Sequence, residues 1–211
     1  MPNGYELSAV VFDLGGVLID WNPDYLYRRL ISDQTERLSF LESVCTAEWN
    51  HSMDAGRSVR EAVAALAEEI PEKADLINAW WERWPEMLGG HFEQTLDIAG
   101  DLSDRGLPIY ALTNWAADTW PFAVERFSFL STLFVGILVS GRESMAKPDP
   151  AIFRLLIQRY GLDPKRTAFI DDSEANIEAA AKLGFQVHLY TGPVRLEAWI
   201  SELEIADGGA D

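Results

Sequence analysis

Short apolar runs alternate with helical patterns along most of the chain. Four runs are rich in β-branched residues and bounded by turn-forming residues, which is typical of strands buried on both faces of a parallel sheet. These runs are Ala9–Leu14, Ile109–Thr113, Thr167–Ile170 and Gln186–Tyr190, with a weaker fifth run at Gly136–Ser140. We therefore predict a parallel sheet built from these strands.

Helical periodicity fills much of the sequence between the apolar runs, at Glu93–Arg105, Pro150–Tyr160 and Glu174–Leu183. Asp149 is placed to cap the second of these helices, and Gly161 is placed to end it. Because strands alternate with helices, we predict an α/β fold with a doubly wound, Rossmann-like parallel sheet covered by helices on both faces.

The segment from Pro23 to Gly90 breaks this alternation because it shows only helical patterns. The patterns cover Asp24–Ile31, Gln34–Val44, Arg60–Ile70 and Lys73–Trp84, and Glu48–His51 with Asp54–Arg57 is expected to be a polar break between helices. We predict that residues 21–90 form a small all-helical cap, inserted after the first strand into an α/β core of residues 1–20 and 91–211. Such an insert can lie over the carboxyl edge of the sheet, where ligands bind in folds of this kind.

Composition narrows the class of protein and its partners. The 211 residues are 48% hydrophobic and 24% charged, which suits a soluble core with an insert. Lys and Arg number 17 against 34 Asp and Glu, so the net charge of −17 disfavours nucleic acid and anionic membranes as partners. A small anionic metabolite would need a local positive site.

The remaining features favour a cytoplasmic protein, either a monomer or a homodimer. The single cysteine, Cys45, excludes an intramolecular disulfide and is expected to be a buried hydrophobe. No apolar run is long enough to span a bilayer, and the first residues lack the pattern of a signal peptide. The acidic tail from Glu202 to Asp211 is expected to fray.

Asp13 follows the first predicted strand and precedes the pair Gly15-Gly16. An ionised carboxylate at the end of a buried strand needs a cation, backbone N–H donors or exposure in a cleft. The glycines permit a tight turn and a close approach of the backbone to a ligand. Asp13 is therefore a candidate functional residue, although a turn or a helix cap would also explain it.

Two further polar motifs follow predicted strands. Thr113 and Asn114 end the second strand, where a hydroxyl and an amide can hold an oxyanion or simply cap the next helix. Lys147 precedes Pro148 and lies close to Pro150, and these prolines stiffen its loop. A lysine presented in this way can neutralise a phosphate or a carboxylate, although a solvated surface lysine is the alternative.

Asp171 and Asp172 follow the strand predicted at Thr167–Ile170. Adjacent carboxylates repel each other unless a cation lies beside them, and Mg²⁺ is the usual ion where phosphate oxygens share its coordination shell. The alternative is one helix-capping and one solvated aspartate. Because all four motifs lie at the carboxyl ends of predicted parallel strands, we expect them to converge on one cleft.

The ordered motifs resemble those of the haloacid dehalogenase (HAD) superfamily: Asp13 in a strand–glycine turn, Thr113-Asn114, Lys147-Pro148-Asp149, and Asp171-Asp172 with Asn176 beyond. The resemblance covers nearly the whole chain, including the helical cap. It is nearest to the cap-bearing sugar-phosphate phosphatases whose first motif reads Asp-Leu-Gly. The resemblance implies a Mg²⁺-dependent phosphatase that acts on a small phosphorylated metabolite.

The resemblance also implies roles for individual residues. Asp13 would attack phosphorus and form an aspartyl-phosphate. Mg²⁺ would be held by Asp13, the carbonyl of Gly15 and Asp172, with Asp171 in or near its shell. Thr113 and the amide of Asn114 would hold phosphate oxygens, Lys147 would offset charge between nucleophile and phosphate, and Asn176 would orient the fourth motif.

One position departs from the phosphatase pattern. Most phosphatases of this superfamily carry a second Asp, a general acid, two residues after the nucleophile, where this chain has Gly15. Its absence implies slow ester hydrolysis, a good leaving group, or another acid. Asp20, Glu48, His51 or a group of the substrate remain open as replacements.

Gly15 also keeps two other functions open. The haloacid dehalogenases use the same nucleophile on carbon without metal or acid, but they carry a bulky aromatic residue at this position and lack the acidic pair. A non-catalytic member that binds a phosphorylated ligand or a protein is the third hypothesis, and retention of Asp13, Thr113, Lys147 and Asp172 argues against it.

Aromatic and basic residues are candidates for substrate recognition. Trp115 directly follows Thr113-Asn114 and is placed to line the cleft. In the cap, Trp49 can stack on a sugar ring and Arg57 can bind an anionic group, although Trp49 can equally fill the core of the cap.

Overall fold

The computed structural model describes residues 6–203, so the expectations for the first residues and for most of the acidic tail lie outside the described residues. One five-stranded sheet has the order β5-β4-β1-β6-β7, and all neighbouring strands are parallel. Its strands are β1 (Ala9–Phe12), β4 (Ile109–Thr113), β5 (Gly136–Val139), β6 (Thr167–Asp171) and β7 (Gln186–Leu189). The predicted α/β fold and its five strands are confirmed.

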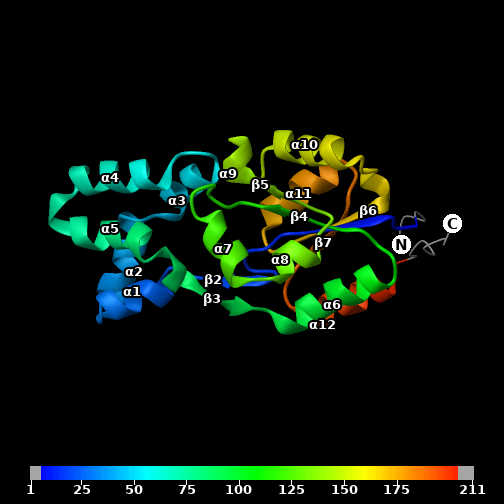
Figure 1. The fold of residues 1–211 in the computed structure, drawn as a ribbon, viewed down its shortest axis with the longest axis horizontal. Coiled ribbons are helices and arrows are strands. Elements are labelled where there is room, and N and C mark those ends of the chain that lie inside the picture. The colour runs from blue at the N-terminus through cyan, green and yellow to red at the C-terminus, as the bar shows by residue number, and fades with distance from the viewer. Residues whose placement is uncertain (1–5, 204–211) are drawn as a thin grey trace.

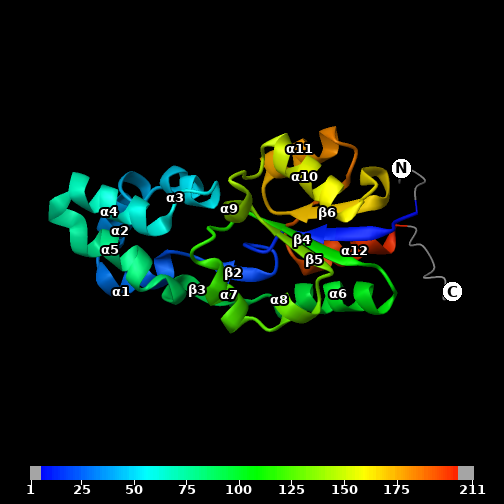
Figure 2. The same cartoon turned by 45° about the horizontal axis from the view of Figure 1, so that its top comes forward.

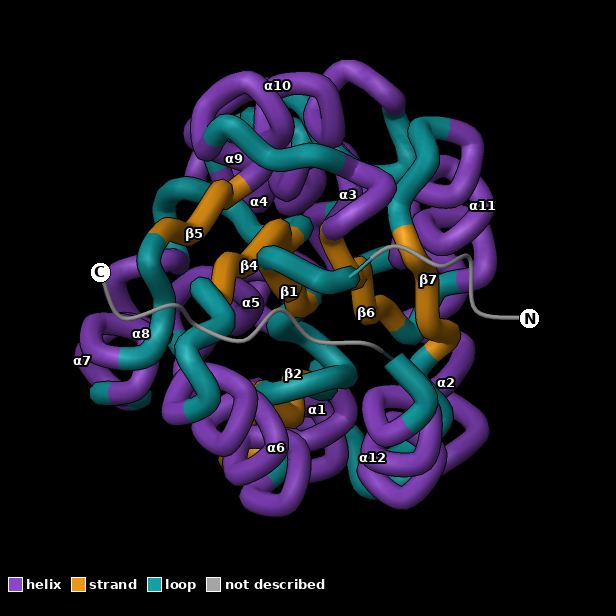
Figure 3. Tube along the Cα trace, turned by 90° about the vertical axis from the view of Figure 1, so that its right-hand side faces the viewer, coloured by secondary structure: helices purple, strands orange, loops and turns teal. Residues whose placement is uncertain are grey.

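Helices cover both faces of this sheet (Figure 3). Helices α10 (Pro150–Tyr160) and α11 (Glu174–Lys182) lie on one face, and α6 (Glu93–Asp104) and α12 (Pro193–Ser201) lie on the other. The period of two along β1 sends Val11 into the core under α10 and α11, and Val10 and Phe12 into the opposite core. The burial of β1 on both faces explains its unbroken apolar sequence.

Shorter helices complete the core, namely α7 (Trp120–Arg126), α8 (Phe129–Thr132), α9 (Ser140–Glu143) and the 3₁₀ turn η3 (Pro164–Arg166). The predicted ends of α10 are confirmed. The Asp149 side chain accepts a hydrogen bond from the N–H of Ala151, and Gly161 adopts a left-handed conformation with φ of 64°. These caps fix where the loop carrying Lys147 meets the helix.

The inserted helices gather at one end of the molecule (Figures 1 and 2). They are α1 (Asp24–Leu30), α2 (Gln34–Ser43), α3 (Ala47–Asp54), α4 (Val59–Glu69), η1 (Pro71–Lys73), α5 (Ala74–Glu82) and η2 (Trp84–Met87). Strands β2 (Ile19–Trp21) and β3 (Leu88–His91) pair antiparallel where the insert leaves and rejoins the core. Packing between Trp80 and its aromatic neighbours Trp21, Tyr27 and Trp49 fills the interior of the insert.

The expectation of a polar break at Glu48–His51 is wrong, because these residues lie inside helix α3. Thr46 caps this helix by accepting a hydrogen bond from the N–H of Trp49 at 3.0 Å. The break falls later, where α3 ends at Asp54 and Gly56 adopts φ of 107°. Strands β2 and β3 were not predicted either, because they are only three and four residues long.

The structure also bears on the expectations for Cys45 and for membrane-spanning segments. Cys45 is buried, as expected, and burial raises the pKa of its thiol to about 12. None of the described helices combines the length and the apolar character that crossing a lipid bilayer demands.

Candidate active site

Asp13 lies at the centre of the carboxyl edge of the sheet, because β1 pairs with β4 on one side and β6 on the other. Its Oδ1 accepts the N–H of Leu14 at 2.7 Å and lies 2.9 Å from Lys147 Nζ. Burial raises the pKa of Asp13 to about 7, against the attraction of Lys147 and with added repulsion from Asp171. The carboxylate is thus held in place, but Lys147 offsets only part of the cost of burying its negative charge.

Lys147 is buried between two carboxylates. Its Nζ lies 2.6 Å from Asp171 Oδ2 as well as 2.9 Å from Asp13 Oδ1. Burial by itself lowers the pKa of a lysine, but the attraction of Asp13 and Asp171 outweighs it and raises the pKa. Lys147 is therefore a fixed positive charge beside Asp13.

Asp171 is also fully buried, and its second oxygen is occupied. Oδ1 accepts hydrogen bonds from the N–H of Ser173 and from Asn176 Nδ2, each at 2.9 Å. Asn176 orients the fourth motif in the way the family resemblance implies. Both oxygens of Asp171 are thus engaged, one by Ser173 and Asn176 and the other by the ammonium of Lys147.

Asp172, by contrast, is exposed, and its carboxylate has room for a cation. Ligand oxygens of Asp13, Asp171 and Asp172 all lie within 4.8 Å of one another. Desolvation and then repulsion from Asp171 raise the pKa of Asp172, so a bound cation would relieve both. Carboxylate oxygens gathered in this way would suit a hard divalent cation such as Mg²⁺.

The two glycines after Leu14 differ in what surrounds them. Gly16 has φ of 75°, and a Cβ there would collide with the Asp172 carboxylate, so the backbone at Gly16 packs directly against this candidate ligand. A Cβ at Gly15 would meet no atom within 4 Å. Within the described part of the chain, no backbone N–H donates to the Gly15 carbonyl, which leaves this oxygen available to a ligand.

Thr113 ends β4 and Asn114 follows it, beside this cluster. The Thr113 hydroxyl is buried and has no hydrogen-bond partner among the described residues, so a ligand oxygen would satisfy it. The Asn114 side chain instead holds the backbone of Lys147, donating to its carbonyl at 2.9 Å and accepting its N–H at 2.8 Å. Only the backbone amide of Asn114 stays open for the expected phosphate contact.

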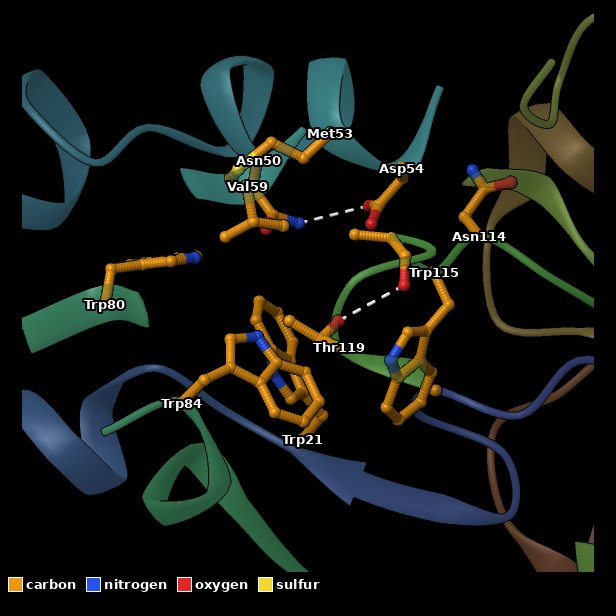
Figure 4. Close-up of a pocket in the computed structure, with 12 residues that line it drawn as sticks. Trp21, Asn50, Met53, Asp54, Val59, Trp80, Trp84, Asn114, Trp115 and Thr119 are labelled. Carbon is orange, nitrogen blue, oxygen red and sulfur yellow. Dashed lines mark hydrogen bonds between the residues drawn. The ribbon is translucent and has the colours of Figure 1, made fainter. Parts of the chain in front are cut away.

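A cavity of about 80 Å³ opens between the core and the inserted helices (Figure 4). From the core it is lined by Gly15, Asn114, Trp115, Ala116 and Thr119, and from β2 and the insert by Trp21, Asn50, Met53, Asp54, Val59, Trp80 and Trp84. Trp115 thus lines the cavity, as the sequence predicts, and its ring centroid lies 5.5 Å from that of Trp84. The site therefore consists of the charged cluster around Asp13 and, beside it, a cavity lined in large part by aromatic side chains.

A family model described as haloacid dehalogenase-like hydrolase matches residues 7–184. The chain belongs to this family of hydrolases.

Relatives of this haloacid dehalogenase-like chain include named phosphatases. The sesquiterpene phosphatase astK of Aspergillus oryzae is 26% identical over 178 residues, which cover 84% of this chain and 86% of the relative. A phosphorylated carbohydrates phosphatase of Thermotoga maritima is 26% identical over 209 residues, which cover 91% of each chain.

Solved structures share the fold. A family enzyme of Bacteroides thetaiotaomicron, solved with magnesium and inorganic phosphate, has a TM-score of 0.65 and 24% identity, and the match covers 86% of this chain and 93% of that one. An L-2-haloacid dehalogenase of Xanthobacter autotrophicus has a TM-score of 0.62 and 18% identity, with coverage of 95% and 85%. The fold is therefore shared with an enzyme solved with magnesium and phosphate and with a haloacid dehalogenase.

Two of the expected substrate contacts lie away from the cavity. Trp49 is not among its lining residues, and its ring packs edge-on against Trp80 with centroids 5.2 Å apart. Arg57 is exposed, just beyond the end of α3. A role in substrate binding for either residue stays a prediction from sequence, and the position of the cavity offers it no support.

Sequence reasoning missed the cavity residues that the insert contributes, above all Asp54 and Asn50. It also missed Ser140, a buried residue after β5 whose hydroxyl donates to the Asp54 carbonyl at 2.6 Å and accepts the N–H of Trp115 at 2.9 Å. The position of Ser140 at the carboxyl end of a predicted strand was a signal that could have identified it.

Proposed function

We propose that this chain is a Mg²⁺-dependent phosphatase that hydrolyses the phosphate ester of a small metabolite, such as a sugar phosphate, through an aspartyl-phosphate on Asp13. The observation that carries the proposal is the cluster of Asp13, Asp171 and Asp172 oxygens within 4.8 Å, with Lys147 buried against two of them. This cluster puts a carboxylate nucleophile beside one fixed cation and one candidate cation site.

The residues present fit a magnesium ion. The carboxylates of Asp13 and Asp172 and the free carbonyl of Gly15 are oxygen ligands, which Mg²⁺ prefers. Asp171 lies near this shell but is already engaged by Lys147. Bound Mg²⁺ would polarise the phosphate and reduce its charge repulsion with the nucleophile.

The chain's own side chains account for the first step of the reaction. A carboxylate that approaches a phosphate dianion meets like charge, and the ammonium of Lys147, 2.9 Å from Asp13 Oδ1, lowers this repulsion. The unpartnered hydroxyl of Thr113 and the backbone amide of Asn114 would donate to phosphate oxygens. Asp13 would then displace the alcohol in line, leaving the phosphoryl group on its carboxylate.

The cavity supports a small leaving group that carries oxygen atoms. Its volume of about 80 Å³ has room for several groups the size of water. Trp80 points its indole N–H into the cavity (Figure 4), and this N–H has no partner within the described residues. Buried indole N–H groups usually find an acceptor, which a hydroxyl or ring oxygen of a sugar would supply.

Part of this site would have no role if the chain were a dehalogenase. Displacement of halide from carbon requires no metal, so the exposed Asp172 carboxylate beside the nucleophile would be purposeless and repulsive. The residue that follows Leu14 is also glycine rather than the bulky aromatic of the dehalogenases. These two features favour phosphorus over carbon as the electrophile.

The proposal is tested by assaying the purified protein on sugar phosphates, other phosphorylated metabolites and 2-haloacids, each with Mg²⁺ and with EDTA. We expect Mg²⁺-dependent phosphate release that disappears in Asp13→Asn, and a phosphoryl group trapped on the peptide containing Asp13. Release of halide without metal, or phosphate release that survives in Asp13→Asn, would overturn the proposal.

A further inference from the structure

Hydrolysis of an alkyl phosphate leaves a strongly basic alkoxide unless a side chain protonates the departing oxygen. Gly15 cannot do so, and the space beside it is open, because a Cβ there would meet nothing within 4 Å. The open space borders the aromatic cavity, which Gly15 helps to line. Efficient hydrolysis of such an ester therefore calls for a proton donor elsewhere in the site.

Asp54 is the only residue with a titratable side chain among the described residues that line this cavity. It is the last residue of α3, and its carboxyl group faces Asn50 in Figure 4, on the side of the cavity that the insert forms. Asn50 Nδ2 donates to its Oδ2 at 3.1 Å. The carboxyl group is thus oriented from within its own helix, one turn back along α3.

Contacts between insert and core fix the position of Asp54. The Ser140 hydroxyl donates to the Asp54 carbonyl at 2.6 Å. Two residues on, the backbone of Gly56 packs so closely on Ser144 that a Cβ would lie 2.8 Å from its Oγ. A general acid must be held to a fraction of an ångström, and these contacts provide that constraint across the junction.

A second anchor follows directly along the chain. Asp118 of the core accepts hydrogen bonds from the Ser58 hydroxyl at 3.0 Å and from the N–H of Val59 at 2.8 Å. The segment from Asp54 to Val59 is therefore attached to the core at several points. Asp118 itself does not line the cavity.

We propose that Asp54 is the general acid and base of this hydrolase and replaces the carboxyl group that is missing at Gly15. The inference rests on the proposed phosphatase function. As Asp13 forms its bond to phosphorus, the bond from phosphorus to the leaving oxygen breaks, and that oxygen takes its electron pair and the Asp54 proton. Asp54, now a carboxylate, then removes a proton from the water that attacks the phosphoryl group and restores Asp13.

The surroundings of Asp54 suit this role at neutral pH. Desolvation raises the pKa of its carboxyl group to about 7, although the amide of Ala116 and the charge of Lys147 oppose the shift. A general acid works best when its pKa lies near the operating pH. The influence of Lys147 also shows that Asp54 lies within electrostatic range of the nucleophile cluster.

The other acids near the site lack this placement. Asp20 accepts a hydrogen bond from the Tyr25 hydroxyl at 2.6 Å and does not line the cavity. Glu48 and His51 are exposed on α3 and do not line it either. The three side chains left open by the sequence are thus less suitable than Asp54.

The test compares Asp54→Asn with the wild type on two phosphate esters. One is the fastest alkyl phosphate of the panel, and the other is 4-nitrophenyl phosphate, whose leaving group departs without a proton. We expect kcat/KM on the alkyl ester to fall by about 10²- to 10⁴-fold. The first turnover of 4-nitrophenyl phosphate should change little, and the phosphoenzyme should then accumulate because the base for the second step is gone.

A rescue variant and a matched control sharpen the result. Gly15→Asp in the Asp54→Asn background should restore alkyl-ester hydrolysis, because the position is open to a side chain. Glu48→Gln, which neutralises an exposed acid of the same helix that does not line the cavity, should leave the hydrolysis of both esters unchanged. Equal losses on both esters in Asp54→Asn, or full retention of alkyl-ester activity, would overturn the role of Asp54. A wild type inactive on every phosphate would instead overturn the proposed phosphatase function, and the role of Asp54 with it.

Discussion

Asn114 holds the backbone of Lys147 with both ends of its side-chain amide, at 2.9 Å and 2.8 Å. The two residues are 33 positions apart, so this pair of hydrogen bonds attaches the loop before α10 to the end of β4. The lysine that faces Asp13 is thereby positioned through its main chain, and its buried ammonium has little freedom to move.

Replacement of Asn114 by alanine should therefore impair catalysis through Lys147. The backbone amide of residue 114 survives this change, so only the hold on Lys147 is lost. We expect kcat/KM to fall by about 10- to 100-fold, as is usual when a group that orients a reactive side chain is removed, with a smaller change in the affinity for inorganic phosphate and Mg²⁺. Asn22→Ala, which removes only an exposed contact to the N–H of Asp24, is the control and should leave kinetics unaltered. An unchanged kcat/KM in Asn114→Ala would contradict this role.

The two carboxylates that contact Lys147 should differ in their effect on stability. Asp171→Asn removes the partner that is itself satisfied by Ser173 and Asn176, and we expect a loss of about 3–5 kcal/mol, typical of a broken buried ion pair. Asp13→Asn should cost much less or stabilise the protein. The raised pKa of Asp13 means that its ionised form is disfavoured in the folded state, and Lys147 keeps Asp171. Urea denaturation in EDTA measures both changes, and equal losses would refute the distinction.

Magnesium affinity should depend on pH through Asp13. In the metal-free protein burial raises the pKa of Asp13 to about 7, so the carboxyl group is mostly protonated below this pH. Mg²⁺ requires the carboxylate, so each pH unit below 7 should weaken apparent binding by about tenfold, with a plateau above. Calorimetric titrations on both sides of pH 7 check this. Asp13→Asn should remove the contribution of this proton, and a flat profile in the wild type would contradict the assignment.

The glycine pair offers a matched test of the candidate metal site. Gly16→Ala places a methyl group against Asp172 at a positive φ, so we expect weakened Mg²⁺ binding and a less stable fold. Gly15→Ala meets open space and should be tolerated. Thermal melting with and without Mg²⁺ distinguishes the two, since only Gly16→Ala should lose the stabilisation by metal. Identical behaviour of the two variants would show that Asp172 is not held as described.

The core and its polar edge were predictable because their signals are local. The apolar run at Ala9–Leu14 shows where β1 lies, and the alternation of strands and helices predicts that β1, β4 and β6 run parallel, whereas their order in the sheet comes from the structure. Once these strands are parallel, the residues that follow them must meet at one edge. The proximity of Asp13 and Asp172 therefore follows from topology, and no knowledge of side-chain packing was needed.

The insert was less predictable because its important contacts are not local. Glu48–His51 has the polar composition of a loop, and only the cap formed by Thr46 signals that α3 begins there. The hydrogen bond from Ser140 to Asp54 joins residues 86 positions apart, and no pattern around either residue indicates it. The same limit explains why the sequence indicates Trp49 and Arg57, rather than Asp54, as functional residues of the insert.

The junction between Ser140 and Asp54 has a consequence for selectivity. The proposed nucleophile follows a strand of the core, whereas the proposed proton donor ends a helix of the insert, so the proposed acid–base chemistry is complete only while these two parts are docked. A phosphate ester too bulky for docking would reach Asp13 without a proton source nearby. Such an ester would occupy the enzyme and dissociate unchanged, so the enzyme would discriminate by reactivity rather than by affinity.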